Sequence, residues 1–293
     1  MSGRRRFHNG GNPRMIKVLM YHRIVEEKSL SEAYWTCVHV REFQKQLELL
    51  DRWGFTPITF NDYSLFLQGE LNLPRKPVIL TFDDGYRDTY DVALPLLQEF
   101  GAKAVVFVLG YQGAATNFWD RSESLPEVAL MDRRQIVELH QAGFEIGSHS
   151  LNHTKLTALT DYDAWQEISR SRILLEILLN SPVRSFSYPY GSLNPYVKEM
   201  VEHAGYDIAC GVSTGPANFG EDPYEIRRIT ILNTTTTSGF ALRLLTPFQY
   251  YGWARWKAGC VLYGRQHDNG AGPGKDATAE TEPPRTLEAS CRR

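Results

Sequence analysis

The sequence predicts an α/β fold, a single domain in which about seven parallel strands form an open sheet or a closed barrel. Short apolar segments alternate with helical patterns about seven times between residues 15 and 232, which is typical of a parallel sheet with helices outside it. The chain has 293 residues, of which 42% are hydrophobic and 23% charged. This is enough for one large domain with a substantial core, or for two small ones.

The first half of the chain alternates between strand and helix candidates. Residues 16–20 are a short apolar run followed by Tyr21-His22-Arg23. Residues 40–53 repeat apolar side chains at helical spacing, and Gly54 closes the pattern, which predicts a helix that buries one face. The other elements expected in this half are a strand at 55–58, a short helix at 61–67, a strand at 78–82, a helix at 90–100 and a strand at 104–109.

The second half continues the alternation after an irregular segment. Residues 110–130 are rich in glycine, asparagine, serine and aromatic residues, so we expect a loop on the active-site side. The elements expected after it are helices at 132–141, 161–180 and 195–204, and strands at 144–146, 185–188, 206–210 and 226–232. We therefore assign residues 15–245 to the α/β domain.

The two ends of the chain differ from this domain. Residues 1–14 are basic and polar, and residues 266–293 contain few large apolar side chains, so we expect a flexible arm and a disordered tail. Residues 246–265 are rich in aromatic and basic side chains and predict a terminal helix. That helix either packs on the domain or makes a peripheral contact with a membrane surface.

Composition argues against several classes of protein. The net charge of −2 gives no general basis for nucleic-acid binding. No apolar run reaches the about 18 residues of a membrane span, and no signal peptide is visible. Cys37, Cys210, Cys260 and Cys291 show no paired spacing. We expect a cytoplasmic protein. If the helix at 246–265 contacts a membrane surface, it would hold the protein there.

The strand at 78–82 leads into two adjacent carboxylates, Asp83 and Asp84, followed by Gly85. Neighbouring carboxylates oppose each other's ionisation unless a cation or hydrogen-bond donors offset their charges. In α/β folds, catalytic groups collect at the carboxyl ends of the strands. Asp-Gly is also common in simple turns, so these residues alone favour a site and a turn about equally.

Two further polar clusters follow predicted strands. His149 and His153 have the spacing that places both imidazoles on one face of a helical turn. Two neutral imidazoles and a carboxylate suit a divalent metal and leave a position for water. The other cluster, Tyr188-Pro189-Tyr190-Gly191, is by itself typical of a turn. Together, the three clusters predict one site at the mouth of the sheet.

The segments 81–85 (TFDDG), 149–153 (HSLNH) and 188–191 (YPYG) resemble the motifs of the polysaccharide deacetylase family, the carbohydrate esterases of family 4 with NodB homology. The resemblance covers roughly residues 15–232. It implies a deformed (β/α) barrel and a metal-dependent enzyme that deacetylates N-acetylated sugars.

By this resemblance, Asp84, His149 and His153 bind a divalent metal, usually Zn²⁺, with Co²⁺ or Ni²⁺ as alternatives. Asp83 is the implied general base. Amide hydrolysis needs groups of these types, because a metal lowers the pKa of a water molecule and a base accepts its proton.

Other residues are expected to face the substrate. By the resemblance, the backbone N–H of Tyr190, beside Pro189, would donate to the oxyanion of the tetrahedral intermediate. The aromatic rings of Trp119 and Tyr190 are candidates for stacking on a sugar. Trp119 would equally suit the core of the domain.

The sequence departs from the common pattern of the family at two positions. The late segment that usually carries the acid histidine is here residues 228–233, which contain no histidine. His22 ends the first strand instead, as in a permuted branch that includes the poly-N-acetylglucosamine deacetylases, so we expect His22 to be the general acid; the alternative is a structural histidine. Ser187 stands where many members have an arginine that steadies the base, and Arg184 is a candidate substitute.

Arg227 and Arg228 are expected to be a strand-end charge pair, with a phosphate site as the alternative. The leading hypothesis is metal-dependent hydrolysis of an N-acetyl group from an amino-sugar glycan, such as an exopolysaccharide, or from a glycolipid or lipid-linked sugar. Two alternatives are a metal-independent hydrolase of cyclic amides or ureides with the same fold, and a catalytically silent glycan-binding protein.

Overall fold

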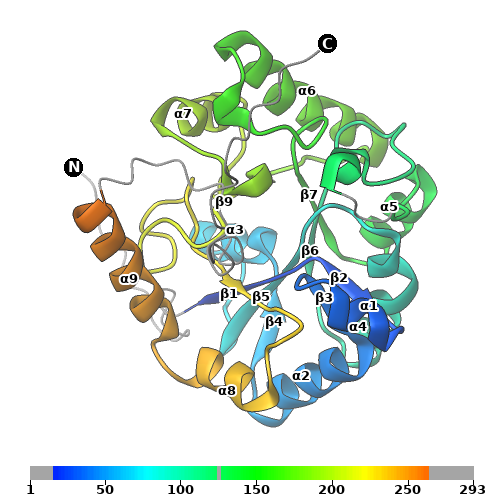
Figure 1. Cartoon of the computed structure of the whole chain (residues 1–293), viewed down its shortest axis with the longest axis vertical. Coiled ribbons are helices and arrows are strands. Elements are labelled where there is room, and N and C mark those ends of the chain that lie inside the picture. The colour runs from blue at the N-terminus through cyan, green and yellow to red at the C-terminus, as the bar shows by residue number, and fades with distance from the viewer. Residues whose placement is uncertain (1–15, 124–126, 264–293) are drawn as a thin grey trace, which may run out of the picture.

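A curled sheet of parallel strands occupies the centre of the molecule, and helices cover its outer side (Figure 1). The computed structural model describes residues 16–123 and 127–263. Among these residues, seven strands pair in the order β10, β1, β5, β6, β7, β8 and β9, and β4 pairs with β5 outside this path. The bounds are β1 Lys17–Tyr21, β4 Thr56–Ile58, β5 Pro77–Phe82, β6 Val105–Val108, β7 Glu145–Ser148, β8 Ser185–Ser187, β9 Ile208–Cys210 and β10 Ile229–Thr230. The expected α/β barrel of about seven parallel strands is confirmed.

Seven helices follow the strands closely along the chain. They are α2 Val40–Arg52, α3 Phe60–Gln68, α4 Leu94–Glu99, α5 Arg133–Gln141, α6 Asp161–Leu179, α7 Pro195–His203 and α8 Thr237–Leu245. Local sequence explains where they begin. The side chains of Asp132 and Gln135 form reciprocal hydrogen bonds with each other's backbone N–H at the start of α5, and Thr59 and Asp62 do the same for α3. A π-helical turn, Thr89–Ala93, precedes α4 and was not expected.

A small unit follows β1 and was missed by the sequence analysis. It contains β2 (Arg23–Val25), α1 (Lys28–Ala33) and β3 (Cys37–His39), and β2 pairs with β3 in parallel. We call residues 23–39 the insertion. Asn233 connects the insertion to the barrel: its backbone N–H donates to the carbonyl of Trp35 at 3.0 Å, and its side chain donates to the carbonyl of Ser31 at 2.7 Å.

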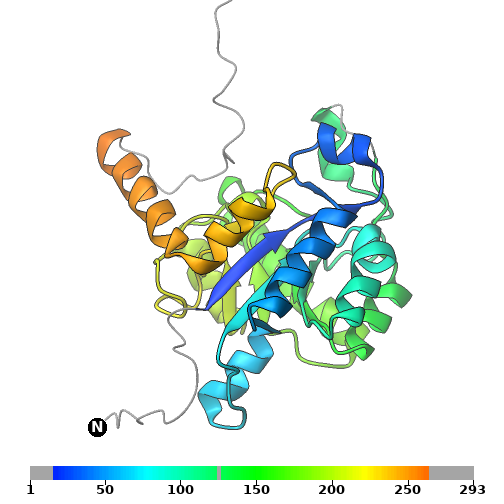
Figure 2. The ribbon, with the colours of Figure 1, turned by 90° about the horizontal axis from the view of Figure 1, so that it is seen from below.

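Helix α9, Phe248–Tyr263, matches the predicted terminal helix. It contacts α8 and extends away from the sheet beside α8 (Figure 2). Lys17 of β1 fixes the end of α8, because its ammonium donates to the carbonyls of Arg243, Leu244 and Thr246. In the described ranges, no helix combines the length and apolarity that a membrane span requires. The predicted arm at 1–14 and the predicted tail at 266–293 lie outside the described residues.

The sheet register brings the predicted site together. Tyr21, the last residue of β1, lies opposite Phe82, the last residue of β5. His22 and Asp83 therefore leave the sheet at the same level, and the backbone N–H of Asp83 donates to the carbonyl of Tyr21 at 3.0 Å. The loops after β7 and β8 open at this same edge, because parallel strands place all their carboxyl ends together.

Candidate metal centre and catalytic groups

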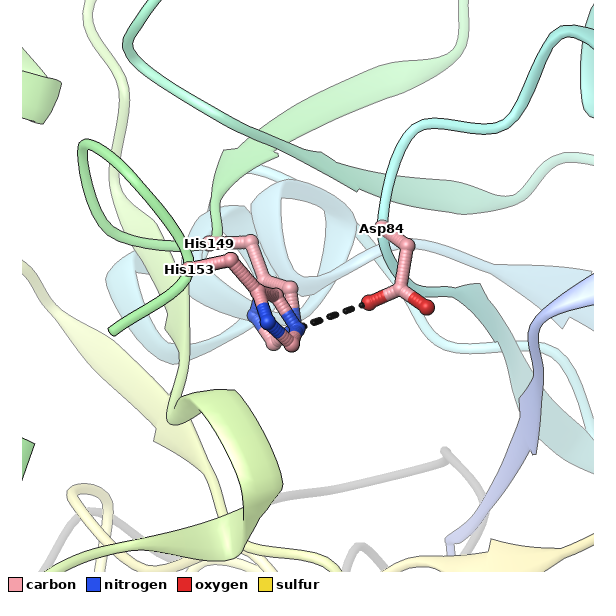
Figure 3. Close-up of side chains that lie close together, drawn as sticks. All are labelled: Asp84, His149 and His153. Atoms are coloured by element: carbon pink, nitrogen blue, oxygen red, sulfur yellow. Dashed lines mark ion pairs between the residues drawn. The ribbon is translucent and has the colours of Figure 1, made fainter. Parts of the chain in front are cut away.

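Three side chains from two loops bring their donor atoms to one point (Figure 3). Nε2 of His149 and Nε2 of His153 each lie 3.2 Å from Oδ1 of Asp84, and all three side chains are buried. Nδ1–H of His149 donates to the carbonyl of Ser187 at 2.7 Å, which leaves Nε2 to face Asp84 with its lone pair. The donor atoms of the three residues lie within 4.8 Å of one another, as a shared metal ion requires.

The expected helical turn between the two histidines is wrong. Residues 150–152 form a non-helical turn, and the backbone N–H of His153 donates to Oγ of Ser150 at 3.0 Å. This turn still brings the imidazole centroids of His149 and His153 to 4.9 Å from each other. The two rings therefore converge because of a tight loop, whereas the sequence spacing had suggested a helical face.

Glu167 of α6 holds this loop from behind. One carboxylate oxygen accepts the backbone N–H groups of Leu151 at 3.1 Å and Asn152 at 2.8 Å, and the other accepts the side-chain amide of Asn152 at 2.7 Å. Glu167 is buried. Its role could not be predicted from the sequence, because one acidic residue in a long helix with other acidic residues carries no local signal.

Asp83 is bound by a buried arginine that the sequence analysis misread. Both guanidinium ends of Arg228 donate to the two carboxylate oxygens of Asp83, each at 2.7 Å. Oγ of Ser187 also donates to Asp83, at 3.2 Å, and accepts from Arg228 at 3.0 Å. Burial alone would raise the pKa of Asp83, but the charge and hydrogen bonds of Arg228 hold that pKa below its ordinary value.

This arrangement corrects two expectations. Arg228 is not part of a strand-end charge pair or a phosphate site, because its guanidinium is fully buried against Asp83. Its neighbour Arg227 donates to backbone carbonyls instead. Arg184 does not replace the missing arginine, since it pairs with Asp207 at the surface at 2.9 Å. No local signal marked the role of Arg228, because one arginine within the strand predicted at 226–232 does not reveal its partner.

The two adjacent carboxylates thus have different partners. Burial would raise the pKa of Asp84, but hydrogen bonds from His149 and His153 hold that pKa well below its ordinary value. The contacts of Arg228 with Asp83, and of the two histidines with Asp84, therefore outweigh the effect of burial. The charge of His22 further lowers the pKa of Asp83 and of Asp84. His22 therefore lies within electrostatic reach of both carboxylates. Its Nδ1 is buried and has no hydrogen-bond partner among the described residues.

Aromatic rings cover the exposed side of His153. The ring of Trp119 stacks on it with a centroid distance of 4.3 Å, and the ring of Tyr190 meets it edge-on at 4.6 Å. Tyr190 is 43% exposed and belongs to the short turn Pro189–Gly191 that follows β8. Trp119 is half-buried and also contacts Phe118. The structure thus brings both predicted aromatic residues to the metal-ligand cluster.

The loops of the site have an unusual backbone. In the described part of the chain, five residues other than glycine have positive φ. Four belong to the site: Asp84 (74°), Ser150 (62°), His153 (60°) and Tyr190 (58°). The fifth, Asn180, ends α6. Side chains with a Cβ rarely adopt this conformation, so three separate loops hold unfavourable local geometry at one mouth.

Comparison with known sequences identifies relatives along most of the chain. A family model described as polysaccharide deacetylase matches residues 70–209. YxkH of Bacillus subtilis, which is named as a polysaccharide deacetylase, is 28% identical over 228 residues, covering 78% of this chain and 75% of that protein. The poly-beta-1,6-N-acetyl-D-glucosamine N-deacetylase of Escherichia coli is 25% identical over 277 residues. That match covers 82% of this chain and 39% of the Escherichia coli protein.

Comparison with solved structures supports the fold. The deacetylase PplD of Streptococcus pyogenes, solved in complex with acetate, superposes with a TM-score of 0.67 at 24% identity. The match covers 80% of this chain and 99% of that protein. At this level of identity, the similarity shows a shared barrel.

Proposed function

We propose that this chain, which is similar to polysaccharide deacetylases over residues 70–209 and to YxkH over 228 residues, hydrolyses the N-acetyl group of an amino-sugar glycan, or of a glycolipid, and releases acetate. The observation that carries the proposal is the position of Asp83 beside the cluster of Asp84, His149 and His153. A proton-accepting carboxylate and a metal-ligand set at one barrel mouth are the parts that amide hydrolysis requires.

The cluster fits a divalent metal by its chemistry. Two imidazole nitrogens and a carboxylate oxygen converge in a buried position, and the hydrogen bond from His149 to the Ser187 carbonyl fixes the tautomer that a ligand needs. Such a metal, most commonly Zn²⁺ with this donor set, would supply Lewis-acid activation of water and of the acetyl carbonyl. We assign Asp84, His149 and His153 as its ligands.

We assign the proton transfers to Asp83 and His22. Asp83 accepts a proton from the attacking water, and Arg228 keeps it ionised and correctly oriented for this task. As the bond between the acetyl carbon and the sugar nitrogen breaks, His22 donates a proton to that nitrogen. The products are acetate and a free amino sugar. Support for His22 comes from its position level with Asp83 at the ends of two paired strands.

We assign substrate contacts to the loop after β8 and to Trp119. The backbone N–H of Tyr190, held by the turn that starts at Pro189, would stabilise the oxyanion. The rings of Trp119 and Tyr190 would limit the space above His153 and contact the sugar.

Acetate release from N-acetylglucosamine oligomers tests the proposal directly. We expect activity in the purified protein, loss of that activity with a chelator, and recovery on addition of Zn²⁺ or Co²⁺. Activity that persists without any bound metal would favour the metal-independent amide hydrolase. Metal binding with no acetate released from any N-acetylated glycan would favour the glycan-binding protein.

A separate proposal concerns the terminal segment 246–265. Tyr250 and Tyr251 of α9 are exposed, and no aspartate or glutamate lies between residues 226 and 263, so this segment suits a peripheral contact with an anionic membrane. Deletion of residues 246–293 should then lower the fraction of protein that sediments with anionic vesicles. Unchanged sedimentation would contradict this contact while leaving the proposed reaction untouched.

A further inference from the structure

The insertion presents an open aromatic ring next to His22. Trp35 is 50% exposed, and its ring centroid lies 6.4 Å from that of His22 at an interplanar angle of 61°. Large aromatic side chains that are buried for stability would show much less exposed surface than this. About half of the surface of Trp35 is therefore solvent-accessible at a position next to His22.

The backbone around Trp35 is fixed on several sides. Its carbonyl accepts the backbone N–H of Asn233 at 3.0 Å, and the carbonyl of Tyr34 accepts from Cys37 at 3.0 Å. The strand β3 that follows is paired with β2, which begins directly after His22. The insertion, which directly follows His22, thus fixes the position of the Trp35 ring. A fixed aromatic surface binds a ligand with little loss of conformational entropy.

We propose that Trp35 forms a binding surface for the sugar unit adjacent to the one that is deacetylated. The inference rests on the proposed function. Trp35 lies beside His22, which directly follows β1, whereas the exposed ring of Tyr190 lies against His153, a residue from the loop after β7. A glycan with its N-acetyl group between His22 and the metal-ligand cluster would have a neighbouring sugar over the indole. Pyranose rings have an apolar face that suits such a surface.

Trp35 would therefore set a preference for oligomeric over monomeric substrates. In the Trp35→Ala variant, we expect kcat/KM for an N-acetylglucosamine tetramer to fall about tenfold, mainly through KM, which corresponds to about 1.4 kcal/mol of lost ring contact. The same constant for monomeric N-acetylglucosamine should stay within about twofold, because the monomer has no neighbouring unit. Trp35→Tyr should lose less than Trp35→Ala, since it keeps an aromatic face.

A matched control is Ile177→Ala, which removes a 72% exposed apolar side chain near the carboxyl end of α6. In this variant, kcat/KM should be unchanged for both the tetramer and the monomer. Equal losses on tetramer and monomer, or no loss on either, would overturn the proposal. Tetramer binding measured by calorimetry in an Asp83→Asn background separates this proposal from the reaction itself. Weaker binding after Trp35→Ala supports the sugar surface even if no acetate release is found, and unchanged binding rejects it.

Discussion

Replacing Arg228 with methionine tests how Arg228 affects two properties, the folding stability of the barrel and the ionisation of the proposed base, Asp83. Arg228 and Asp83 are both buried and joined by two hydrogen bonds of 2.7 Å. Methionine has similar bulk but no charge, so Arg228→Met leaves the carboxylate of Asp83 in a buried position with only Ser187 as a side-chain donor. Breaking one side of a buried ion pair costs about 3–5 kcal/mol of folding free energy.

The loss should depend on pH, and its sign follows from the pKa of Asp83. In the wild type, Arg228 lowers this pKa, so the pair stabilises the fold above the unfolded pKa of about 3.9 and loses that contribution as the pH falls through the folded pKa. Arg228→Met removes the largest contribution that lowers this pKa, so we expect burial to raise the pKa of Asp83 above its ordinary value. Protonation then favours the folded state, and the variant's deficit in unfolding free energy should shrink as the pH is lowered from neutral.

Urea unfolding of both proteins at about pH 7.5 and about pH 5, with a chelator present to remove any metal contribution, measures this deficit. The acid limb of kcat/KM for acetate release should also move to higher pH in the variant. The matched control is Asp83→Asn combined with Arg228→Met, which removes both charges and should be less destabilised than Arg228→Met alone. A deficit below about 1 kcal/mol, or one that is equal at both pH values, would refute the reasoning.

Two further variants test the groups around the metal-ligand cluster. Glu167→Ala removes three hydrogen bonds from the loop of His153 and should weaken Zn²⁺ affinity about 10–100-fold, measured by competition with a chromogenic chelator. The control is Glu176→Ala, which removes a half-buried ion pair with Arg172 and a hydrogen bond from the backbone N–H of Val183, farther along α6. Equal affinities for both variants would contradict the role of Glu167. His22→Gln should lower kcat for acetate release from N-acetylglucosamine oligomers by about 10²–10⁴-fold while Zn²⁺ affinity stays unchanged, and full retained activity would reject His22 as the acid.

The regular part of the barrel could be predicted because its signals are local. Strands such as β5 and β6 are continuous apolar runs, and α3 and α5 begin at capping boxes. The insertion could not be predicted, because β2 and β3 have three residues each and α1 has six, which is too short for a periodic pattern. Their structure depends on contacts with the barrel, such as those of Asn233.

Some residues of the site could likewise be predicted from the sequence, and others could not. The residues at the ends of the strands could be found, because adjacent polar residues after an apolar run stand out in the sequence. Arg228 and Glu167 could not, since each acts across the fold: Arg228 reaches a carboxylate 145 positions earlier in the chain, and Glu167 binds a loop 15 and 16 positions earlier. Nothing in the residues next to them distinguishes a buried partner from a surface charge.

The left-handed residues of the three site loops have a consequence for how the protein evolves. Asp84, Ser150, His153 and Tyr190 each hold a conformation that disfavours a Cβ by about 1 kcal/mol or more. In a protein that only bound glycans, drift toward glycine at such positions would relieve this burden, and the fold would become more stable. The loops therefore carry a trade-off between stability and activity, which selection maintains only while their geometry is in use.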